Sequence, residues 1–366
     1  MVFQKTLSRL FYACFVFVLF SLSAYSCFSK HCNSRYSIRE VLQAYGFQEN
    51  KQIEAIEDLF QRSGVIPSYA TLDHAFPPRN SKEDLVIDII NMLQSVQKKF
   101  ILRTGSQERW EVEALKWMEH DKDKILQDLK VLGFIDPILP KHKNADSFCI
   151  LGAAAARMKN RIDYAQHLLS YGVTTKNVIL LAGERYVTKG IDGTEDQLIS
   201  LSKSFGLSNW TQLTETHLIE DLYLKSELFQ NSFPFYVINT PRRELPRPTT
   251  QTTILELLNW LSDHKAIHRI IFVSNQPHVK YQEAVINLLL KEHMLNIQYE
   301  VVGNKATNVN DVCSVIGALG SYMWTITPDV LAKMHIQIED QNIKNLLRRL
   351  YEHNPIIYNT VPKQLR

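Results

Sequence analysis

The stretch Phe-Cys-Ile-Leu-Gly-Ala-Ala-Ala-Ala-Arg at residues 148–157 has the pattern of a buried strand that turns directly into a helix. Four apolar side chains come first, and a glycine and four alanines then let a helix pack close to the strand. Three later apolar runs, at 178–183, 235–240 and 270–274, also lead through a polar loop into helical spacing. This alternation predicts an α/β fold, Rossmann-like and doubly wound, with a mostly parallel sheet.

The same reading places the remaining elements of this part of the chain. A fifth, shorter apolar run occupies 297–302. Helices are expected at 153–171, 251–263 and 280–293. A further helix is expected to begin after the N-cap Thr194, which forms a capping box with Gln197. Asn308 is expected to cap a helix that ends at Tyr322, and one or two terminal helices are expected within 328–351. We therefore assign 145–366 to a Rossmann-like α/β domain with C-terminal helices.

Residues 34–140 lack convincing strands and predict a helical N-terminal region. Within it, 81–102 opens with Ser81 and Asp84, an approximate capping box, and continues with apolar residues at helical spacing. The stretch 107–132 repeats that spacing, and Gly133 is a plausible C-terminal stop. A proline-punctuated basic stretch at 136–143 is taken as the boundary between the two regions.

The first 26 residues form a separate segment. Lys5 and Arg9 precede an apolar run at 10–22, and Ala24 and Ser26 have the small side chains of a cleavage site. The run is shorter than the roughly 20 residues needed to span a bilayer. A cleaved signal peptide is favoured over an uncleaved membrane anchor, so we expect an exported protein that is periplasmic, tethered to the inner membrane or secreted. Membrane association, if any, is expected through this N-terminus.

Composition limits the classes of partner. Of the 366 residues, 45% are hydrophobic and 22% charged, which is ordinary for a globular protein. The net charge is only +3, which falls well short of the concentrated positive charge of a nucleic-acid-binding surface. No nucleic-acid partner is therefore predicted. No Gly-x-Gly-x-x-Gly fingerprint and no Cys/His cluster with metal spacing occurs, so neither a cofactor nor a metal is predicted. Cys27 and Cys32 could pair in an oxidising compartment, or stay reduced.

Polar residues follow the first two strands. In the first turn, Gly152 and the alanines would let a ligand approach a helix N-terminus, and Arg157 follows, one turn before Arg161. The alternative is that the alanines only allow close helix packing. In the second turn, Gly183 precedes the pair Glu184 and Arg185. We interpret Glu184 as a candidate acid or base and Glu195, further along, as a ligand contact. Alternatively, Glu184 is a solvated charge in a loop, and Glu195 only favours the start of its helix.

The third turn is the richest in positive charge. Arg242, Arg243 and Arg247 lie within six residues of a proline-rich loop that leads to Thr250 at a helix start. Guanidinium groups and helix N–H groups together suit a phosphate or a carboxylate. An ordinary soluble loop is the alternative.

The fourth turn supplies a hydroxyl, two amides and an imidazole just beyond a buried strand. They belong to Ser274, Asn275, Gln276 and His278. His278 is the candidate for proton transfer near neutral pH. Ser274 does not lie in a Gly-x-Ser-x-Gly elbow, so a hydrolase triad is not supported. A hydrogen-bonded structural histidine is the alternative.

The order of these turns resembles that of the YdcF/SanA/ElyC-like family, over roughly residues 145–303. This order is strand-Gly-small-Arg, strand-Ala-Gly-Glu, Asn-Thr-Pro-Arg and Val-Ser-Asn-Gln-Pro-His. The family is bacterial and has a Rossmann-like sheet, and several members are tethered to the inner membrane and linked to envelope integrity. Ala153–Ala156 and Glu184 depart from its usual turns. The resemblance implies a small-molecule site at Gly152, Glu184, Glu195, Thr250 and His278, but no particular reaction.

Two functions remain open from the sequence. The first is an exported protein that binds a small anionic or nucleotide-like molecule, or an envelope precursor, and that transfers or hydrolyses a phosphate-bearing group if it is an enzyme. The second is a non-catalytic envelope or host-interaction protein that binds a partner through its helical region. A catalytic site requires Glu184, Arg247 and His278 to meet at one hollow, whereas scattered positions favour the second function.

Overall fold

The computed structural model describes residues 35–102, 112–243, 247–306, 312–336 and 340–352. The expected signal segment at 1–26, Cys27, Cys32 and the expected N-cap Asn308 lie outside these residues. Within the described ranges, none of the helices combines the length and the apolarity that crossing a bilayer requires.

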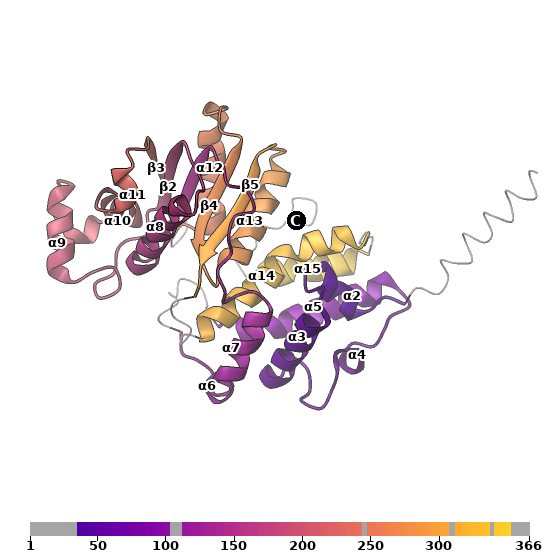
Figure 1. Ribbon diagram of the computed structural model, residues 1–366. Coiled ribbons are helices and arrows are strands. Elements are labelled where there is room, and N and C mark those ends of the chain that lie inside the picture. The colour runs from indigo at the N-terminus through magenta and orange to yellow at the C-terminus, as the bar shows by residue number, and fades with distance from the viewer. Residues whose placement is uncertain (1–34, 103–111, 244–246, 307–311, 337–339, 353–366) are drawn as a thin grey trace, which may run out of the picture.

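Five strands form one sheet, and every neighbouring pair is parallel, which confirms the predicted fold class (Figure 1). Their order across the sheet is β3-β2-β1-β4-β5. The strands are β1 Ser147–Leu151, β2 Asn177–Gly183, β3 Phe235–Thr240, β4 Arg269–Asn275 and β5 Gln298–Asn304. The chain builds outward from β1 to β3 and then returns to place β4 on the other side of β1. The carboxyl ends of β1 and β4 therefore flank the switch point where open α/β sheets bind ligands.

Helices cover both faces of this sheet, which explains why the central strands β1, β2 and β4 are mainly apolar. In β1, Phe148 and Ile150 point to one core, and Cys149 and Leu151 point to the other. The first face carries α8 Ala155–Ser170, α10 Glu215–Leu224 and α11 Glu227–Gln230, with α9 Glu195–Ser204 and the short helix Trp210–Gln212 beside them. The second face carries α12 Thr250–Asp263 and α13 Val279–Glu292. We call β1–β5 with α8–α13 the α/β unit.

The other helices share a separate hydrophobic core and form what we call the helical unit. They are α2 Ile38–Ala44, α3 Asn50–Ser63, α4 Leu72–Ala75, α5 Lys82–Phe100, α6 Lys116–His120, α7 Lys122–Val131, α14 Val312–Lys333 and α15 Gln341–Glu352. The C-terminal helices therefore lie among the N-terminal ones, as Figure 1 shows. The expected division grouped the C-terminal helices with the α/β domain; α14 shares the core of the N-terminal helices through α5 and also packs on α13 of the α/β unit.

Several local predictions are confirmed. Ser81 accepts a hydrogen bond from the Asp84 N–H at the start of α5, and Thr194 and Gln197 form the capping box of α9. Gly133 follows α7 with φ +79°, the left-handed conformation that favours glycine.

Other helix predictions are wrong in extent. The described part of 107–132 is divided at Asp121 into α6 and α7. In contrast, α14 continues past Tyr322 and through Pro328 to Lys333. The hydroxyl of Thr327 donates to the Met323 carbonyl one turn earlier, and burial of this turn offsets the backbone bond that the proline cannot make.

Candidate functional site

A cavity of about 450 Å³ lies at the carboxyl ends of the strands, between the α/β unit and the helical unit. The turns after β1, β2, β3 and β4 line one side of it. The end of α5 and the first turns of α14 line the other. Its polar lining comprises Arg157, Arg161, Arg185, Glu215, Arg247, Thr249, Thr250, Thr253, His278, Tyr281, Ser314 and Ser321.

Three long helices of the α/β unit have their N-cap residues at this cavity. The N-cap residues of α8, α12 and α13 are Ala154, Thr249 and His278, and all three line it. The first backbone N–H groups of a helix carry partial positive charge, so three such ends around one space favour an anion there. Ala154 has no side-chain oxygen to cap its helix, and Asp192 instead accepts from the Ala155 N–H at 3.0 Å.

Arg161 fixes the floor of the cavity at the switch point. Its guanidinium donates to the carbonyls of Leu151 and Gly152, both at 2.6 Å, and to Asn275 Oδ1 at 2.8 Å. It thereby ties the carboxyl end of β1 to that of β4. The side chain is almost fully buried, and this burial, together with the nearby charge of Arg157, lowers the pKa of Arg161 to about 9.

Arg185 and Glu215 form a buried ion pair at the cavity wall. The Arg185 Nε donates to Glu215 Oε2 at 2.9 Å, and its terminal nitrogens donate to both oxygens of Asp192 at 3.0 Å. Burial raises the pKa of Glu215, and the charge of Arg185 opposes that shift. A Cβ at Gly152 would collide with Glu215 Oε1 and lie 2.9 Å from the Ala182 Cβ. Only glycine therefore lets Glu215 approach the end of β1 this closely.

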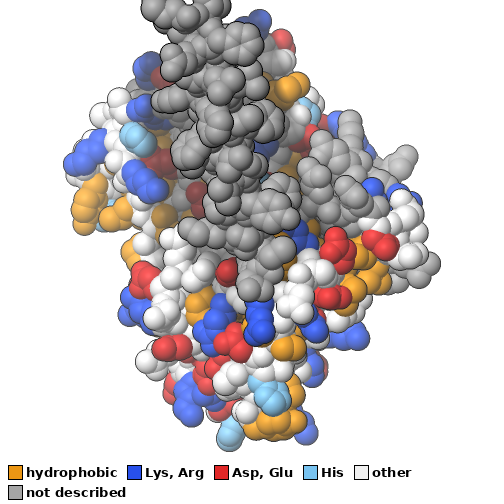
Figure 2. All heavy atoms as spheres, turned by 90° about the vertical axis from the view of Figure 1, so that its right-hand side faces the viewer, with side chains coloured by type: hydrophobic (Ala, Val, Ile, Leu, Met, Phe, Trp, Pro, Cys, Tyr) orange, Lys and Arg blue, Asp and Glu red, His pale blue; other side chains and the backbone are white. Residues whose placement is uncertain are grey.

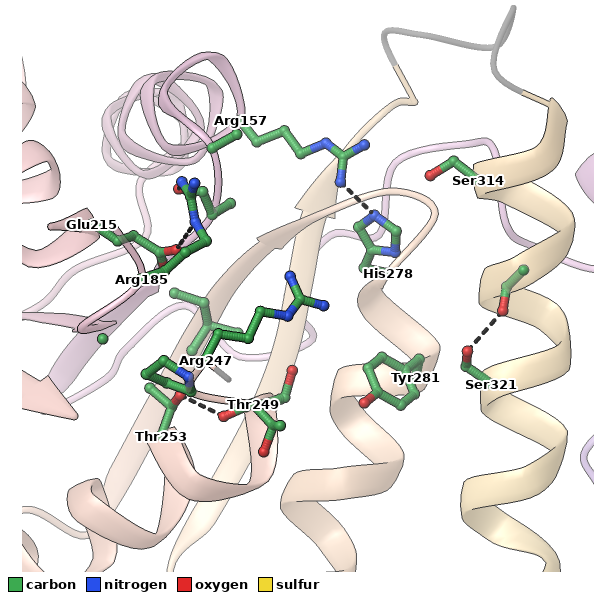
Figure 3. Close-up of a pocket in the computed structure, with 18 of the residues that line it drawn as sticks. Arg157, Arg185, Glu215, Arg247, Thr249, Thr253, His278, Tyr281, Ser314 and Ser321 are labelled. Atoms are coloured by element: carbon green, nitrogen blue, oxygen red, sulfur yellow. Dashed lines mark hydrogen bonds and ion pairs between the residues drawn. The ribbon is translucent and has the colours of Figure 1, made fainter. Parts of the chain in front are cut away.

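Arg157 and His278 meet across the switch point (Figure 3). Arg157 reaches from α8 toward the start of α13, and its Nη1 lies 3.1 Å from His278 Nε2. A guanidinium only donates, so this contact requires Nε2 to accept and leaves the ring proton of a neutral imidazole on Nδ1. The geometry thus presents a positive charge and a proton acceptor side by side.

Arg247 enters the same space from the turn after β3. Figure 3 shows its side chain extending toward the middle of the pocket, with Thr249 and Thr253 below it and Tyr281 on the neighbouring α13. Ser314 and Ser321 of α14 stand on the opposite wall. Within the described residues, the lining contains four arginines and one carboxylate, all on the α/β side. That side of the cavity therefore carries a net positive charge.

The structure brings together about half of the residues selected from the sequence. Those that line the cavity are Gly152, Arg157, Gly183, Arg247, Thr250 and His278. At Gly183 a Cβ would lie 2.6 Å from the ring of Pro248, so this glycine lets the arginine-rich loop pack on the end of β2.

Glu184 and Arg242 lie outside that lining. The Glu184 carboxylate accepts from the Asn239 side chain and from the Arg242 backbone N–H, each at 2.9 Å. These two bonds lower the pKa of Glu184, so it stays ionised and holds the loop after β3 in place. Of the three residues whose convergence a catalytic site requires, Arg247 and His278 share the cavity and Glu184 does not.

The other selected residues also have structural partners. Arg243 pairs with Glu256, and Glu195 pairs with Lys189, both at exposed positions. Ser274 donates to Gln282 on α13. The amide of Asn275 donates to the Gln276 carbonyl, in addition to its bond with Arg161. Gln276 donates to the carbonyls of Gly133 at 3.1 Å and Asp136 at 2.9 Å, which links β4 to the segment leading out of α7.

Sequence reasoning did not select several residues that line the cavity. Arg161 lies one helical turn after Arg157, and Arg185 directly follows Glu184. This closeness to selected residues was the only signal in the sequence that pointed to them. Glu215 begins α10, a helix that the sequence pattern did not reveal. Ser314 and Ser321 belong to α14, and only the packing of the helical unit brings them to the site.

The part of the chain that the structure describes contains no group of three or more His, Cys, Asp or Glu side chains able to hold a metal ion. Cys149 lies in the middle of β1, where burial raises the pKa of its thiol well above the ordinary value. Comparison of the chain with protein-family models, with curated proteins and with solved structures finds no match.

Proposed function

We propose that this chain is an exported protein that binds a small anionic, phosphate-bearing molecule, such as a nucleotide-like compound or an envelope precursor, in the strand-end cavity. One observation carries the proposal: Arg157, Arg247 and the N-termini of three helices meet around one space of about 450 Å³. Planar guanidinium groups and helix N–H groups are the donors that bind phosphate oxygens most effectively in proteins.

The size of the cavity supports a small organic molecule as the ligand. Sites for such molecules typically enclose about 300 to 1,000 Å³ and combine a mainly apolar lining with a few converging polar groups. The described lining has this character, with the hydroxyl groups of Thr250, Thr253 and Tyr281 beside the arginines.

Because Glu184 lies outside the cavity, an extension of the proposal to hydrolysis of a phosphate ester depends on His278 as the proton-transferring group. Water would form a bond to phosphorus as the bond from phosphorus to the ester oxygen breaks. Arg157 would turn from His278 Nε2 to the bound phosphoryl group, and the Nε2 lone pair that this releases would take a proton from the water and return it to the leaving oxygen. Arg157 would then stabilise the charge on the phosphoryl oxygens. The contact between Arg157 and His278 supports these roles, because a phosphate held by this arginine lies next to the imidazole.

Calorimetric titration of the protein with inorganic phosphate and adenosine monophosphate tests the binding proposal. We expect Arg247→Ala to weaken binding about tenfold to hundredfold, since a charged hydrogen bond contributes about 1.5 to 3 kcal/mol. Arg243→Ala is the matched control, because Arg243 lies on the same loop but pairs with Glu256 outside the cavity. Equal affinities of the two variants would count against the proposal.

The alternative is a protein that binds a macromolecular partner through its helical region. Figure 2 shows the side of the molecule at the right of Figure 1, and in its lower part Lys and Arg side chains lie among Asp and Glu side chains. Ion pairs such as Arg39 with Asp73 occur on this unit. Mixed charge of this kind is typical of a solvated surface. The helical unit also supplies one wall of the cavity, which favours the small-molecule proposal.

Export is proposed from the charged and apolar pattern of residues 1–26. Fractionation of cells that produce the full-length protein tests it. Recovery outside the cytoplasm, together with loss of that location when residues 1–26 are deleted, is the expected result.

A further inference from the structure

The two sides of the cavity differ in charge: the charged groups of the described lining all lie on the α/β side, beside apolar residues such as Leu151 and Leu181, whereas the helical side has hydrocarbon side chains and two serines. The α/β side contributes the arginines and the helix N-termini. The helical side contributes the hydrocarbon side chains of Phe100, Ile101, Leu102 and Val112 around the end of α5. An anionic ligand alone would be served by the first side and would leave the second in contact with water.

The apolar wall is built by close packing within the helical unit. Phe100 and Ile101 approach α14 at Gly320, where a Cβ would lie 3.0 and 2.9 Å from them. Phe100 is completely buried, whereas Leu102 and Val112 are only partly buried at the cavity surface. Exposed hydrocarbon opposite a cationic site is where an apolar part of a ligand gains most from leaving water.

We infer that the ligand is amphiphilic: an organic phosphate whose phosphoryl group lies at Arg157 and Arg247 and whose hydrocarbon group lies against Leu102 and Val112. This inference rests on the proposed function and adds to it the class of ligand. It also gives the helical unit a role, since that unit forms the surface that selects for the hydrocarbon. Inorganic phosphate and hydrophilic phosphate esters bind more weakly because they leave this wall unused.

A series of alkyl phosphates tests the inference with the full-length protein. Calorimetric titration with inorganic, ethyl, butyl and hexyl phosphate should give affinities that rise about fourfold for each CH₂ group that becomes buried. Equal affinities along the series, with inorganic phosphate still bound, overturn the inference and leave the proposed function standing. Failure of every member to bind overturns the proposed function itself.

Leu102→Asn provides the matching variant. It should lower the affinity for hexyl phosphate on the order of tenfold and reduce the rise along the series. Val112→Asn repeats the test on the other side of the wall, should Leu102→Asn lower the thermal transition temperature. Ile87→Asn is the control, because Ile87 lies on α5, the helix that precedes Leu102, but is 40% exposed and outside the cavity lining. A rise along the series that is the same in all three variants contradicts the inference.

The same chemistry occurs in soluble alkyl phosphates and in lipid headgroups, and a second arm separates these sources. The protein is sedimented with phosphatidylcholine vesicles that contain or lack phosphatidic acid. The wild-type protein and Arg247→Ala are compared, and both keep the same N-terminal segment, so a difference between them cannot come from that segment. Sedimentation that requires phosphatidic acid and is lost in Arg247→Ala assigns the source to a lipid. Sedimentation that is equal in both proteins, with the alkyl series intact, assigns it to a soluble ester.

Discussion

The two ends of the central sheet carry charged residues in different arrangements. At the amino end, Asp146 accepts from the backbone N–H groups of His268 at 2.9 Å and Arg269 at 3.0 Å, and from Lys176 at 2.7 Å. The guanidinium of Arg269 donates to the side chains of Asn144 and Gln298. These bonds join adjacent strands. At the carboxyl end, arginines surround a cavity of about 450 Å³.

The difference shows what distinguishes a structural charge from a candidate binding charge. The amino-end groups bond to neighbouring backbone and side chains across the strand ends, so their role is to hold adjacent strands together at this end of the sheet. At the carboxyl end, Arg161 has this structural role as well, while Arg157, which contacts His278, extends from α8 and Arg247 extends from the turn after β3 into a common space. A concave space with convergent polar groups is the general sign of a ligand site.

Arg161→Ala should give the largest effect on stability. The substitution leaves the carbonyls of Leu151 and Gly152 and the side chain of Asn275 without their buried donor, and we expect a loss of about 3 kcal/mol in the free energy of unfolding. Arg269→Ala at the half-exposed amino end should cost about 1 kcal/mol. Urea denaturation measures both, and equal losses would contradict the structural distinction between the two ends.

Gly152→Ala should be the next largest. The added methyl group collides with Glu215 and Ala182, and overpacking of this kind costs about 2 kcal/mol. A double-mutant cycle with Glu215→Ala checks the cause. If the collision with Glu215 is responsible, the double variant loses less stability than the sum of the two single variants, whereas simple additivity would show that another contact dominates.

The helical unit should show its own dependence on pH. Burial and a hydrogen bond with Asp58 raise the pKa of Asp128 to about 7. The folded state therefore prefers the protonated carboxyl, and stability falls as the pH rises from about 4 through 7. We expect a fall of about 1.5 kcal/mol after allowance for solvent screening. Denaturation of Asp128→Asn at pH 5 and pH 8 should show a smaller difference than the wild-type protein, and an unchanged difference would rule out this carboxyl.

The amino end of the sheet should respond with the opposite sign. Hydrogen bonds from Lys176, His268 and Arg269 outweigh burial and lower the pKa of Asp146 to about 2. The stabilisation is present above the unfolded pKa of about 4 and is lost as the pH falls toward 2. We expect a contribution of about 1 kcal/mol, because part of this network is exposed. Asp146→Asn should remove it, as measured by denaturation at pH 6 and pH 3.

The fold was predictable because its signal is local. The central strands β1, β2 and β4 are mainly apolar runs buried on both faces, whereas β3 and β5 at the edges are partly exposed. Capping residues such as Thr194 and Ser81 mark where helices begin. Extents were less predictable where packing overrides local preference, as at Pro328 inside α14. The grouping of α14 with α5 depends on contacts between residues more than 200 positions apart, for which the sequence pattern has no signal.

The site was predictable in position but only partly in its residues. Strand-end turns identify Arg157, Arg247 and His278, since parallel strands bring their carboxyl ends to one edge. They do not tell which of two adjacent charged residues points inward. Glu184 and Arg185 are neighbours, yet the arginine lines the cavity and the glutamate holds the neighbouring loop. Glu215 meets Arg185 from 30 residues away, and that pairing follows only from the packing of α10 on β2.

Calorimetric titration with phosphate of the wild-type protein, the double variant Arg157→Ala/Arg247→Ala and the amino-end variant Arg269→Ala tests the central claim most directly. Binding at the carboxyl-end cavity predicts that the double variant loses affinity at least a hundredfold, since each charged hydrogen bond contributes about 1.5 to 3 kcal/mol, while Arg269→Ala binds like the wild type. Wild-type affinity in the double variant, or loss of affinity in Arg269→Ala alone, would contradict it.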